Sequence, residues 1–316
     1  MTSRVLITGG AGFIGCNTAR RLLAAGHDVT ALDDLSLGIG SNIPAGVRLV
    51  QADVAREATW AELAPADWIV HLAGASSAPM FPDNLVACFD NNILGFIRVL
   101  EFARRSGARR VVFASTSSVY GNVDPPLREE GPLDIPNFYA VSKYGMEQIA
   151  RMFHLQYGLE VIGLRFMSVY GPREDHKGTF ANLVSQFIWD VEAGRSPTIY
   201  GDGSQTRDFT NVWDVARAIE RVLAHPGPLG AGVFNVGTGR GTPVNELVTL
   251  LGELTGREVR PRHIDNPVKS GYVRQQIADI SRIRAQLGWE PEVSLRDGVR
   301  EILELRGLLS VPAPGG

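Results

Sequence analysis

The chain is poor in cysteine and contains no long run of apolar residues. Its two cysteines, Cys16 and Cys88, have neither the spacing of a metal site nor that of a disulfide framework, so we expect buried thiols and no bound metal. No apolar stretch is long enough to span a membrane, and the first expected strand begins too early to leave room for a signal peptide. We therefore expect a cytoplasmic protein that does not enter membranes.

Lysine is also scarce. Only Lys143, Lys177 and Lys269 occur, and arginine supplies the other basic residues. The net charge is −3 and no basic run is present, so nothing in the sequence suggests a surface built for nucleic acid. The scarcity makes a lysine inside a motif more informative than it would be in a lysine-rich chain.

Apolar runs of strand length alternate with amphipathic segments of helix length over the first half of the chain. We expect strands at residues 5–8, 29–33, 48–52, 68–73, 110–115 and 161–166. Helices are expected between them, for example at residues 17–25 and 93–106. Near-continuous apolar strands with helical crossovers predict the α/β class, with a Rossmann-type doubly wound parallel sheet.

The alternation weakens after about residue 166, where loop-rich stretches separate helices expected at residues 181–192, 244–254 and 295–305. A helix at 214–223 and a strand at 233–236 are expected to return to the sheet. We therefore predict a cofactor domain at residues 1–166, to which 208–240 returns, and a smaller C-terminal α+β substrate lobe made of 167–207 and 241–316. The cleft between the two is the natural place for a site.

Three glycines follow the first strand with the spacing G-x-x-G-x-x-G, at Gly9, Gly12 and Gly15, and a helix follows them. One glycine allows the tight turn, one lets the backbone approach a pyrophosphate, and one lets the helix pack on the strand. The N-terminus of the helix then offers free N–H groups and the positive end of its dipole to the phosphates.

The second strand ends in Asp33 and Asp34, eighteen residues beyond the last of these glycines. A carboxylate there can accept hydrogen bonds from the adenosine ribose and would repel the additional phosphate of NADP. The position favours Asp33 as the residue that holds the ribose, and the pattern predicts NAD as the cofactor.

The glycine spacing resembles that of the extended short-chain dehydrogenase/reductase family, and further segments similar to that family follow in order. They include Gln51–Val54, His71–Gly74 and the helix segment that contains Asn92. The resemblance implies cofactor contacts from Gly9, Gly12, Phe13, Ile14, Gly15, Asp33, Asp34, Asp53, Val54, Leu72, Ala73, Gly74, Asn92, Ser115, Tyr139, Lys143 and Phe166.

Tyr139 and Lys143 form a Tyr-x-x-x-Lys motif, which places the phenol and the ammonium on one face of a helix. A lysine cation and a bound nicotinamide would lower the pKa of the phenol, so that Tyr139 could act as a base toward a sugar hydroxyl. The motif alone is modest evidence. It follows a strand ending in Ser115 and Thr116 that resembles the active-site strand of the family, and this predicts Thr116 as the hydroxyl that bonds to the reacting oxygen.

The residues after Thr116 help to narrow the reaction. Family members that dehydrate nucleotide sugars carry an Asp-Glu pair there, decarboxylases of UDP-glucuronate keep a glutamate at the second position, and this chain has Ser117 and Ser118. The 3,5-epimerases use a cysteine near this strand, and neither cysteine of this chain is close in sequence. The resemblance therefore implies 4-epimerisation by transient oxidation at C4, most similar to enzymes that interconvert UDP-glucose and UDP-galactose. The alternatives are a decarboxylase or dehydratase of the same family, a small-molecule dehydrogenase, and an NAD-sensing protein without activity.

The second half contains the segments expected to bind the substrate. By resemblance, a UDP-sugar would contact Thr116, Ser117, Ser168, Asn182, Tyr200, Arg207 and Lys269. Ser168 stands where the family usually has asparagine, and either Lys269 or Arg274 would replace a basic residue that has no clear match here. The resemblance further implies a homodimer, in which the helices beginning near Asp90 and Tyr139 meet their counterparts.

Overall fold

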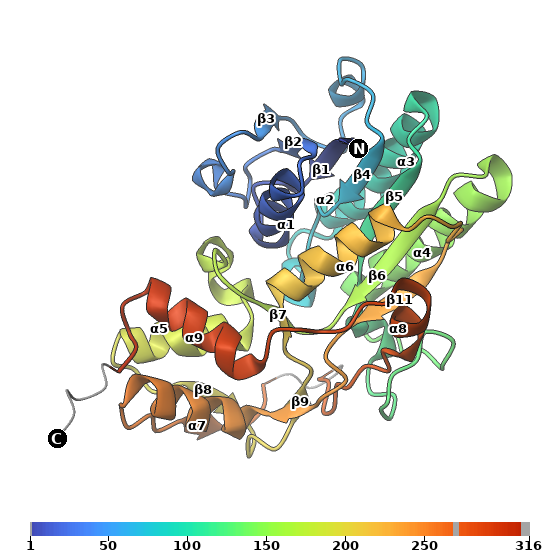
Figure 1. Cartoon of the computed structure of the whole chain (residues 1–316). Helices are drawn as coiled ribbons and strands as arrows, with labels where there is room; N and C mark the ends of the chain where they lie inside the picture. Colours follow the sequence, from blue (N-terminus) through green and yellow to red (C-terminus); the bar gives the residue numbers. More distant parts are fainter. Residues whose placement is uncertain (1, 268–271, 311–316) are drawn as a thin grey trace.

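The computed structural model describes residues 2–267 and 272–310, and within these ranges a parallel sheet carries helices on both faces (Figure 1). Seven strands of this described part pair in the order β11-β6-β5-β4-β1-β2-β3, all of them parallel. They are β1 (Arg4–Thr8), β2 (Asp28–Asp33), β3 (Arg48–Gln51), β4 (Trp68–His71), β5 (Arg110–Thr116), β6 (Val161–Phe166) and β11 (Val233–Val236). The predicted doubly wound α/β fold is confirmed.

Two hydrophobic clusters bury the two faces of the sheet. The first brings apolar side chains of α1, α6 and α8 onto one face, and the second brings those of α3 and α4 onto the other. The helices of the described residues are α1 (Phe13–Ala24), α2 (Leu85–Phe89), α3 (Gly95–Ser106), α4 (Phe138–Tyr157), α5 (Leu183–Glu192), α6 (Val212–Ala224), α7 (Val244–Thr255), α8 (Ser281–Leu287) and α9 (Leu295–Leu305). None of them combines the length and the apolar character that a membrane span requires.

The expected strands all occur, with ends that differ by no more than two residues from those predicted. Two helical boundaries differ more. Helix α1 begins at Phe13 rather than at residue 17, because Gly12 has extended backbone and ends the turn directly before it. Helical structure also starts at Leu85, ahead of the predicted residue 93, and reaches α3 through a π-helical turn at Asp90–Leu94.

The order of the strands locates a crevice in the sheet. The chain runs from β1 outward to β2 and β3 on one side, and from β4 to β5, β6 and β11 on the other. At such a reversal the loops that follow neighbouring strands diverge, which leaves a crevice at the carboxyl ends of β1 and β4.

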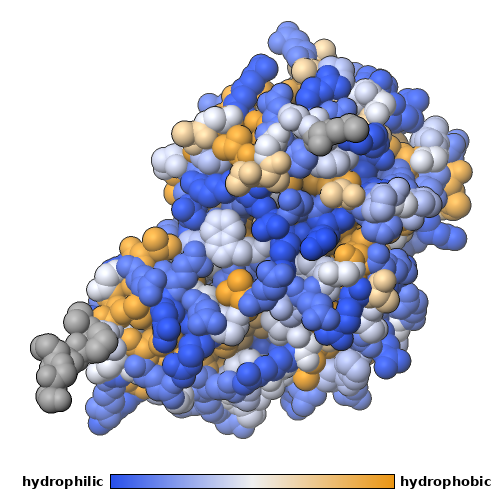
Figure 2. Space-filling view, viewed as in Figure 1, coloured by the Kyte–Doolittle hydropathy of each residue, from blue (hydrophilic) through white to orange (hydrophobic). Residues whose placement is uncertain are grey.

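The second lobe has a hydrophobic core of its own, formed by α5, α7 and α9. Three small two-stranded sheets accompany it: β7 (Val169–Tyr170) with β10 (Thr210–Asn211), β9 (Thr206–Arg207) with β12 (Thr242–Pro243), and β8 (Thr198–Tyr200) with β13 (Arg262–Ile264). In Figure 2, viewed as in Figure 1, this lobe lies at the lower left. Strand β11 pairs with β6, as expected of a segment that returns to the sheet, whereas the domain boundaries themselves stay predictions.

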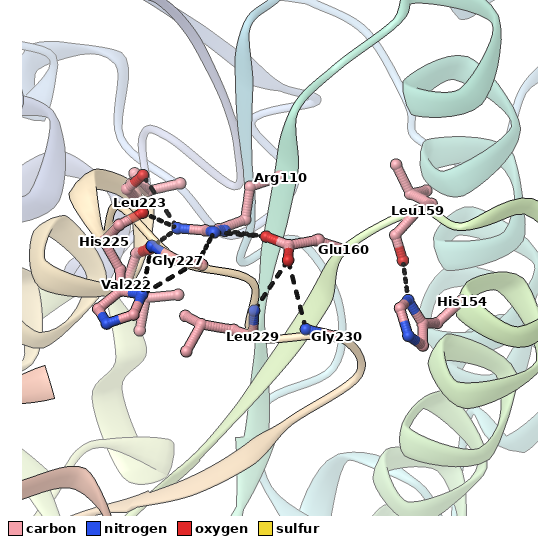
Figure 3. Close-up of polar contacts among 10 residues, drawn as sticks. All are labelled: Arg110, His154, Leu159, Glu160, Val222, Leu223, His225, Gly227, Leu229 and Gly230. Atoms are coloured by element: carbon pink, nitrogen blue, oxygen red, sulfur yellow. Dashed lines mark hydrogen bonds and ion pairs between the residues drawn. The ribbon is translucent and has the colours of Figure 1, made fainter. Parts of the chain in front are cut away.

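The amino end of the sheet is held by an ion pair between the buried Arg110 and the partly buried Glu160 (Figure 3). The guanidinium of Arg110 also donates to the carbonyls of Val222, Leu223, His225 and Gly227, which follow or end α6. The Glu160 carboxylate accepts from the backbone nitrogen of Leu229, just before β11. The contact ties β5, β6, α6 and β11 together at the end of the sheet opposite the crevice.

Candidate active site

The crevice at the carboxyl ends of the strands opens into a cavity of about 810 Å³ that extends to the second lobe. Its walls come from the glycine turn, from the ends of β2, β4, β5 and β6, and from residues 176, 177 and 180–182. Most of the predicted cofactor residues line it, namely Gly9, Gly12, Phe13, Ile14, Gly15, Asp33, Asp34, Val54, Leu72, Ala73, Gly74, Ser115, Tyr139, Lys143 and Phe166. A cavity of this size lies in the range that suits a cofactor or ligand.

The glycine turn leaves no room for side chains. Gly9 has a left-handed φ of 70°, and a Cβ on it would lie 2.6 Å from the backbone nitrogen of Ala73. A Cβ on Gly15 would lie 2.0 Å from the carbonyl oxygen of Gly9. The N-terminal turn of α1 therefore sits directly on the loop and faces the cavity, where its N–H groups suit a pyrophosphate.

The two acidic residues after β2 differ in their surroundings. Asp33 is buried and accepts hydrogen bonds from the backbone nitrogens of Ala11 and Leu35, each at 2.9 Å. Burial raises the pKa of its carboxyl, which the two backbone hydrogen bonds oppose. Asp34 is exposed and bonds to Ser36 within its own turn. Each carboxylate oxygen has more than one lone pair, so Asp33 can still accept hydrogen bonds from ribose hydroxyls.

Asp53 and Asn92 do not line the cavity. Asp53 accepts from the backbone nitrogen of Ala55 and pairs with Arg56, while its neighbour Val54 reaches the cavity wall. Asn92 is fully buried in the π-helical turn and donates to Ser142 Oγ at 2.9 Å and to the carbonyl of Ala75 at 3.1 Å. π-Helical turns recur at functional sites. This one ties α4 to the segment after β4.

Thr116, Tyr139 and Lys143 lie together on the cavity wall. Thr116 ends β5, and Tyr139 and Lys143 occupy successive turns at the start of α4. Asn137 begins that helix, since its side chain accepts from the backbone nitrogen of Ala140. The Thr116 hydroxyl is hydrogen-bonded to the Tyr139 phenol. The predicted catalytic residues are thus brought together.

The electrostatics of this group differ from the prediction in one respect. Burial raises the pKa of the Tyr139 phenol, and the hydrogen bond from Thr116 opposes the rise, whereas Lys143 makes no resolved contribution. Burial lowers the pKa of Lys143 to about 8. Desolvation penalises both charged forms and outweighs the attraction that the motif suggests.

Ser117, directly after Thr116, is hydrogen-bonded to a residue that no sequence motif identified. Gln276 is buried in the cavity wall, donates to Ser117 Oγ at 2.7 Å, and accepts from Ser168 Oγ at 2.6 Å. A single amide therefore bridges two predicted substrate residues. No motif surrounds Gln276, and only the position of its chain segment beside β5 could have identified it.

Of the remaining predicted substrate residues, some line the cavity and others do not. Asn182 lines the cavity at the start of α5, but Tyr200 and Arg207 do not line it. The Arg207 guanidinium lies 5.4 Å from the centre of the Tyr272 ring, and Tyr200 lies 6.4 Å from the same ring. The three residues form a separate group near β8 and β9. Lys269 lies outside the described residues.

Cys88 also lies on the cavity wall, in a hydrophobic cluster with Tyr139 and Phe81. It is distant from the active-site strand in sequence but not in space. Burial raises the pKa of its thiol, which donates to the carbonyl of Met80. At neutral pH it therefore remains a thiol that packs against the site.

A family model described as the NAD dependent epimerase/dehydratase family matches residues 5–237. The UDP-glucose 4-epimerase of Mycolicibacterium smegmatis is 37% identical over 312 residues, which cover 95% of this chain and 97% of the relative. The structure of a UDP-glucose 4-epimerase from Thermotoga maritima with UDP-glucose superposes with a TM-score of 0.90 at 33% identity, covering 96% of this chain and 99% of that one. A Thermus thermophilus UDP-glucose 4-epimerase in complex with NAD gives a TM-score of 0.86 at 33% identity, with coverage of 97% and 100%.

Proposed function

Because this chain belongs to the NAD-dependent epimerase/dehydratase family, we propose that it is a nucleotide-sugar epimerase that interconverts UDP-glucose and UDP-galactose by inverting C4. The observation that carries this proposal is the group of Thr116, Tyr139 and Lys143 beside a wall of Ser117, Ser168 and Gln276. Among the described residues of that wall, no carboxylate follows Thr116. A site of this composition can oxidise and reduce a sugar but offers no acid or base there for dehydration or decarboxylation.

The cavity fits NAD, because the glycine turn exposes backbone N–H groups and Asp33 stands at the end of β2. Bound NAD supplies an acceptor that takes a hydride from C4 and later returns it. Tyr139 takes the proton of the C4 hydroxyl as the carbon is oxidised and gives it back as the carbon is reduced. Thr116 holds the reacting oxygen and lowers the pKa of the phenol by its hydrogen bond, and with NAD bound the Lys143 cation would add to this, although it makes no resolved contribution in the cofactor-free site.

Inversion requires the keto sugar to turn between the two hydride transfers, so that its other face meets the cofactor. The short side chains of Ser117 and Ser168 line the place where we expect the sugar, and they support this turn because they leave room and can bond to hydroxyls of either face. Asn182, Arg207, Tyr200 and Lys269 are proposed to bind the nucleotide and diphosphate. An arginine fork suits paired phosphate oxygens.

The proposal is tested by incubating the enzyme with UDP-, GDP-, CDP- and dTDP-sugars and following the products by NMR. We expect inversion at C4 of UDP-glucose or UDP-galactose with no net growth of NADH absorbance, because the cofactor is regenerated in each turnover. Accumulating NADH would indicate a simple dehydrogenase. Loss of a carboxyl group or of water from the sugar would indicate the other activities of the family, and either result would refute epimerisation.

We also propose that two copies of the chain associate through α4. Phe138 and Val141 near the start of α4, and Met152 and Leu155 three turns later, are each three residues apart, and all four are between 46% and 64% exposed. A stripe of this kind is typical of a helix that packs against another.

The two free, buried cysteines support a reducing cytoplasm as the place of action. Residues 1–166 with 208–240, and 167–207 with 241–316, are proposed as the cofactor domain and the substrate lobe.

A further inference from the structure

A segment of the second lobe, residues 172–180, lies over the start of α1. Asn17 of α1 is fully buried and donates to the carbonyls of Phe13 at 2.9 Å and of Pro172 at 3.0 Å. Arg173, which has a left-handed φ of 71°, donates to the side-chain oxygen of the same asparagine. The segment is therefore fixed to the helix whose N-terminus faces the glycine turn.

Lys177 is held at that helix terminus. Its ammonium lies 5.7 Å from the centre of the Phe13 ring, and Phe13 is the first residue of α1. The ammonium also donates to Glu174 at 3.1 Å. The Glu174 carboxylate is buried and accepts from the backbone nitrogen of Asn182 and from Ser185 Oγ.

In this arrangement the Lys177 ammonium uses only part of its capacity to donate hydrogen bonds. A lysine ammonium has three N–H donors, and Glu174 takes one of them. Lys177 lines the cavity together with Gly12 and Phe13. The anchored carboxylate thus places a partly free cation beside the site suited to a pyrophosphate.

His176 supplies a second group to the same end of the cavity, close to Asp33. It lines the cavity, and its Nδ1 is buried without a hydrogen-bond partner among the described residues. Burial and Lys177 lower the pKa of the imidazole, while Asp33 and a hydrogen bond with the backbone of Arg173 oppose this, so the neutral form of the ring is favoured. A neutral imidazole with an unpartnered nitrogen can bond to a ribose hydroxyl.

We propose that residues 172–180 form a clamp by which the second lobe holds NAD, with Lys177 contacting the pyrophosphate and His176 contacting the adenosine ribose beside Asp33. The clamp adds a side-chain cation to the positive end of the α1 dipole. It also makes both lobes part of the cofactor site, so that NAD leaves only when this segment lifts from α1. This suits an enzyme that regenerates its cofactor in each turnover, and the inference rests on the NAD dependence of the family rather than on the identity of the sugar.

The test uses the purified full-length chain, stripped of cofactor and titrated with NADH by fluorescence. Lys177→Met keeps the aliphatic stem and removes the charge, and we expect the Kd for NADH to rise about 5- to 30-fold at low salt. Lys177→Arg should restore most of the affinity. The matched control is Thr179→Ala, because Thr179 belongs to the same segment, is exposed and does not line the cavity. Its Kd should stay within about twofold of that of the unchanged protein, which corresponds to about 0.4 kcal/mol.

Salt and stability separate binding from a merely structural role. A phosphate contact is screened by salt, so raising the KCl concentration should weaken NADH binding of the unchanged chain more steeply than that of Lys177→Met. His176→Ala should raise the Kd with little change in this salt dependence. If Lys177→Met lowers the Tm of the cofactor-free protein but binds NADH as tightly as Thr179→Ala does, the segment only joins the lobes and the proposal is wrong.

Discussion

Burial acts in opposite directions on the two titratable groups of the catalytic motif. It raises the pKa of Tyr139 and lowers that of Lys143 to about 8, which moves the two values apart and places the pKa of the lysine below that of the phenol. At neutral pH the phenol is protonated and the lysine is mostly charged. Transfer of a proton from the phenol to the neutral amine therefore costs more than it would between an ordinary tyrosine and lysine.

Replacing Tyr139 by Phe removes the hydroxyl and keeps the ring. We expect kcat for epimerisation to fall by about 10²- to 10⁴-fold, because the proton of the sugar hydroxyl then has no acceptor. The affinity for NADH, measured by fluorescence, should change little. A variant that keeps more than a tenth of the activity would contradict the assigned role.

The pH dependence of kcat should reflect Lys143. Since its folded-state pKa is lowered to about 8, the cation is present below that pH and is lost as the pH rises through it. We therefore expect activity to fall above about pH 8. Lys143→Arg keeps its charge at alkaline pH, so whatever activity it retains should persist to a higher pH. An alkaline limb in the same place for both proteins would assign the titration to another group.

Single residues were predictable where a motif surrounds them. The glycine turn, Asp33, Thr116, Tyr139 and Lys143 all belong to local patterns whose chemistry requires those residue types, and the structure brings them to one cavity. Gln276 could not be predicted, because it belongs to a segment about 110 residues after β6 that only the tertiary fold brings to Ser117 and Ser168. The pKa of Tyr139 was also beyond the sequence, since desolvation depends on how the whole site is packed.

At the scale of elements, α4 is tied to the sheet by a buried ion pair behind the active site. Glu147, two turns after Tyr139, accepts two hydrogen bonds from Arg165 of β6, at 2.8 and 2.7 Å. It also accepts from Ser115 Oγ of β5 at 2.6 Å. The helix that carries the catalytic motif is thereby held against the strands that end in Thr116 and Phe166.

Removing one partner of this pair should destabilise the fold. Glu147→Gln leaves the guanidinium of Arg165 buried without its counter-charge, and we expect the free energy of unfolding to fall by about 3–5 kcal/mol. Urea unfolding at a fixed NAD concentration measures this change. The double variant Glu147→Gln with Arg165→Met removes the stranded charge and should lose less than the sum of the two single variants. Strict additivity would contradict the pairing.

Elements with a strong apolar pattern were predicted well, and those without one were not. Central strands such as β5 and β6 are buried on both faces and therefore form distinct apolar runs. The apolar pattern predicted a helix only from residue 93, because Asp90, Asn91 and Asn92 interrupt it, whereas helical structure begins at Leu85. Their helical state depends on tertiary contacts such as the bond from Asn92 to Ser142.

At the scale of the whole molecule, the exposed stripe on α4 should decide the state of association. Changing Val141 and Leu155 to Glu places charges on that stripe, and we expect the protein to become monomeric by light scattering with its NADH affinity retained. Leu305→Glu is the matched control, because Leu305 on α9 is as exposed as Leu155, at 66% and 64%. If the Leu305 variant becomes monomeric and the α4 variant does not, the interface lies on the second lobe.

The contacts that Arg110 and Glu160 make at the amino end of the sheet can form only late in the synthesis of the chain. The partners of Arg110 at Val222–Gly227 and the strand β11 leave the ribosome about 70 residues after β6. At usual rates of elongation the nascent chain therefore waits roughly 4–14 s with β6 as an open edge and with the Arg110 guanidinium lacking its carbonyl partners. An unpaired edge strand invites pairing with other chains. This interval is the stage of its production at which we expect the chain to depend most on chaperones.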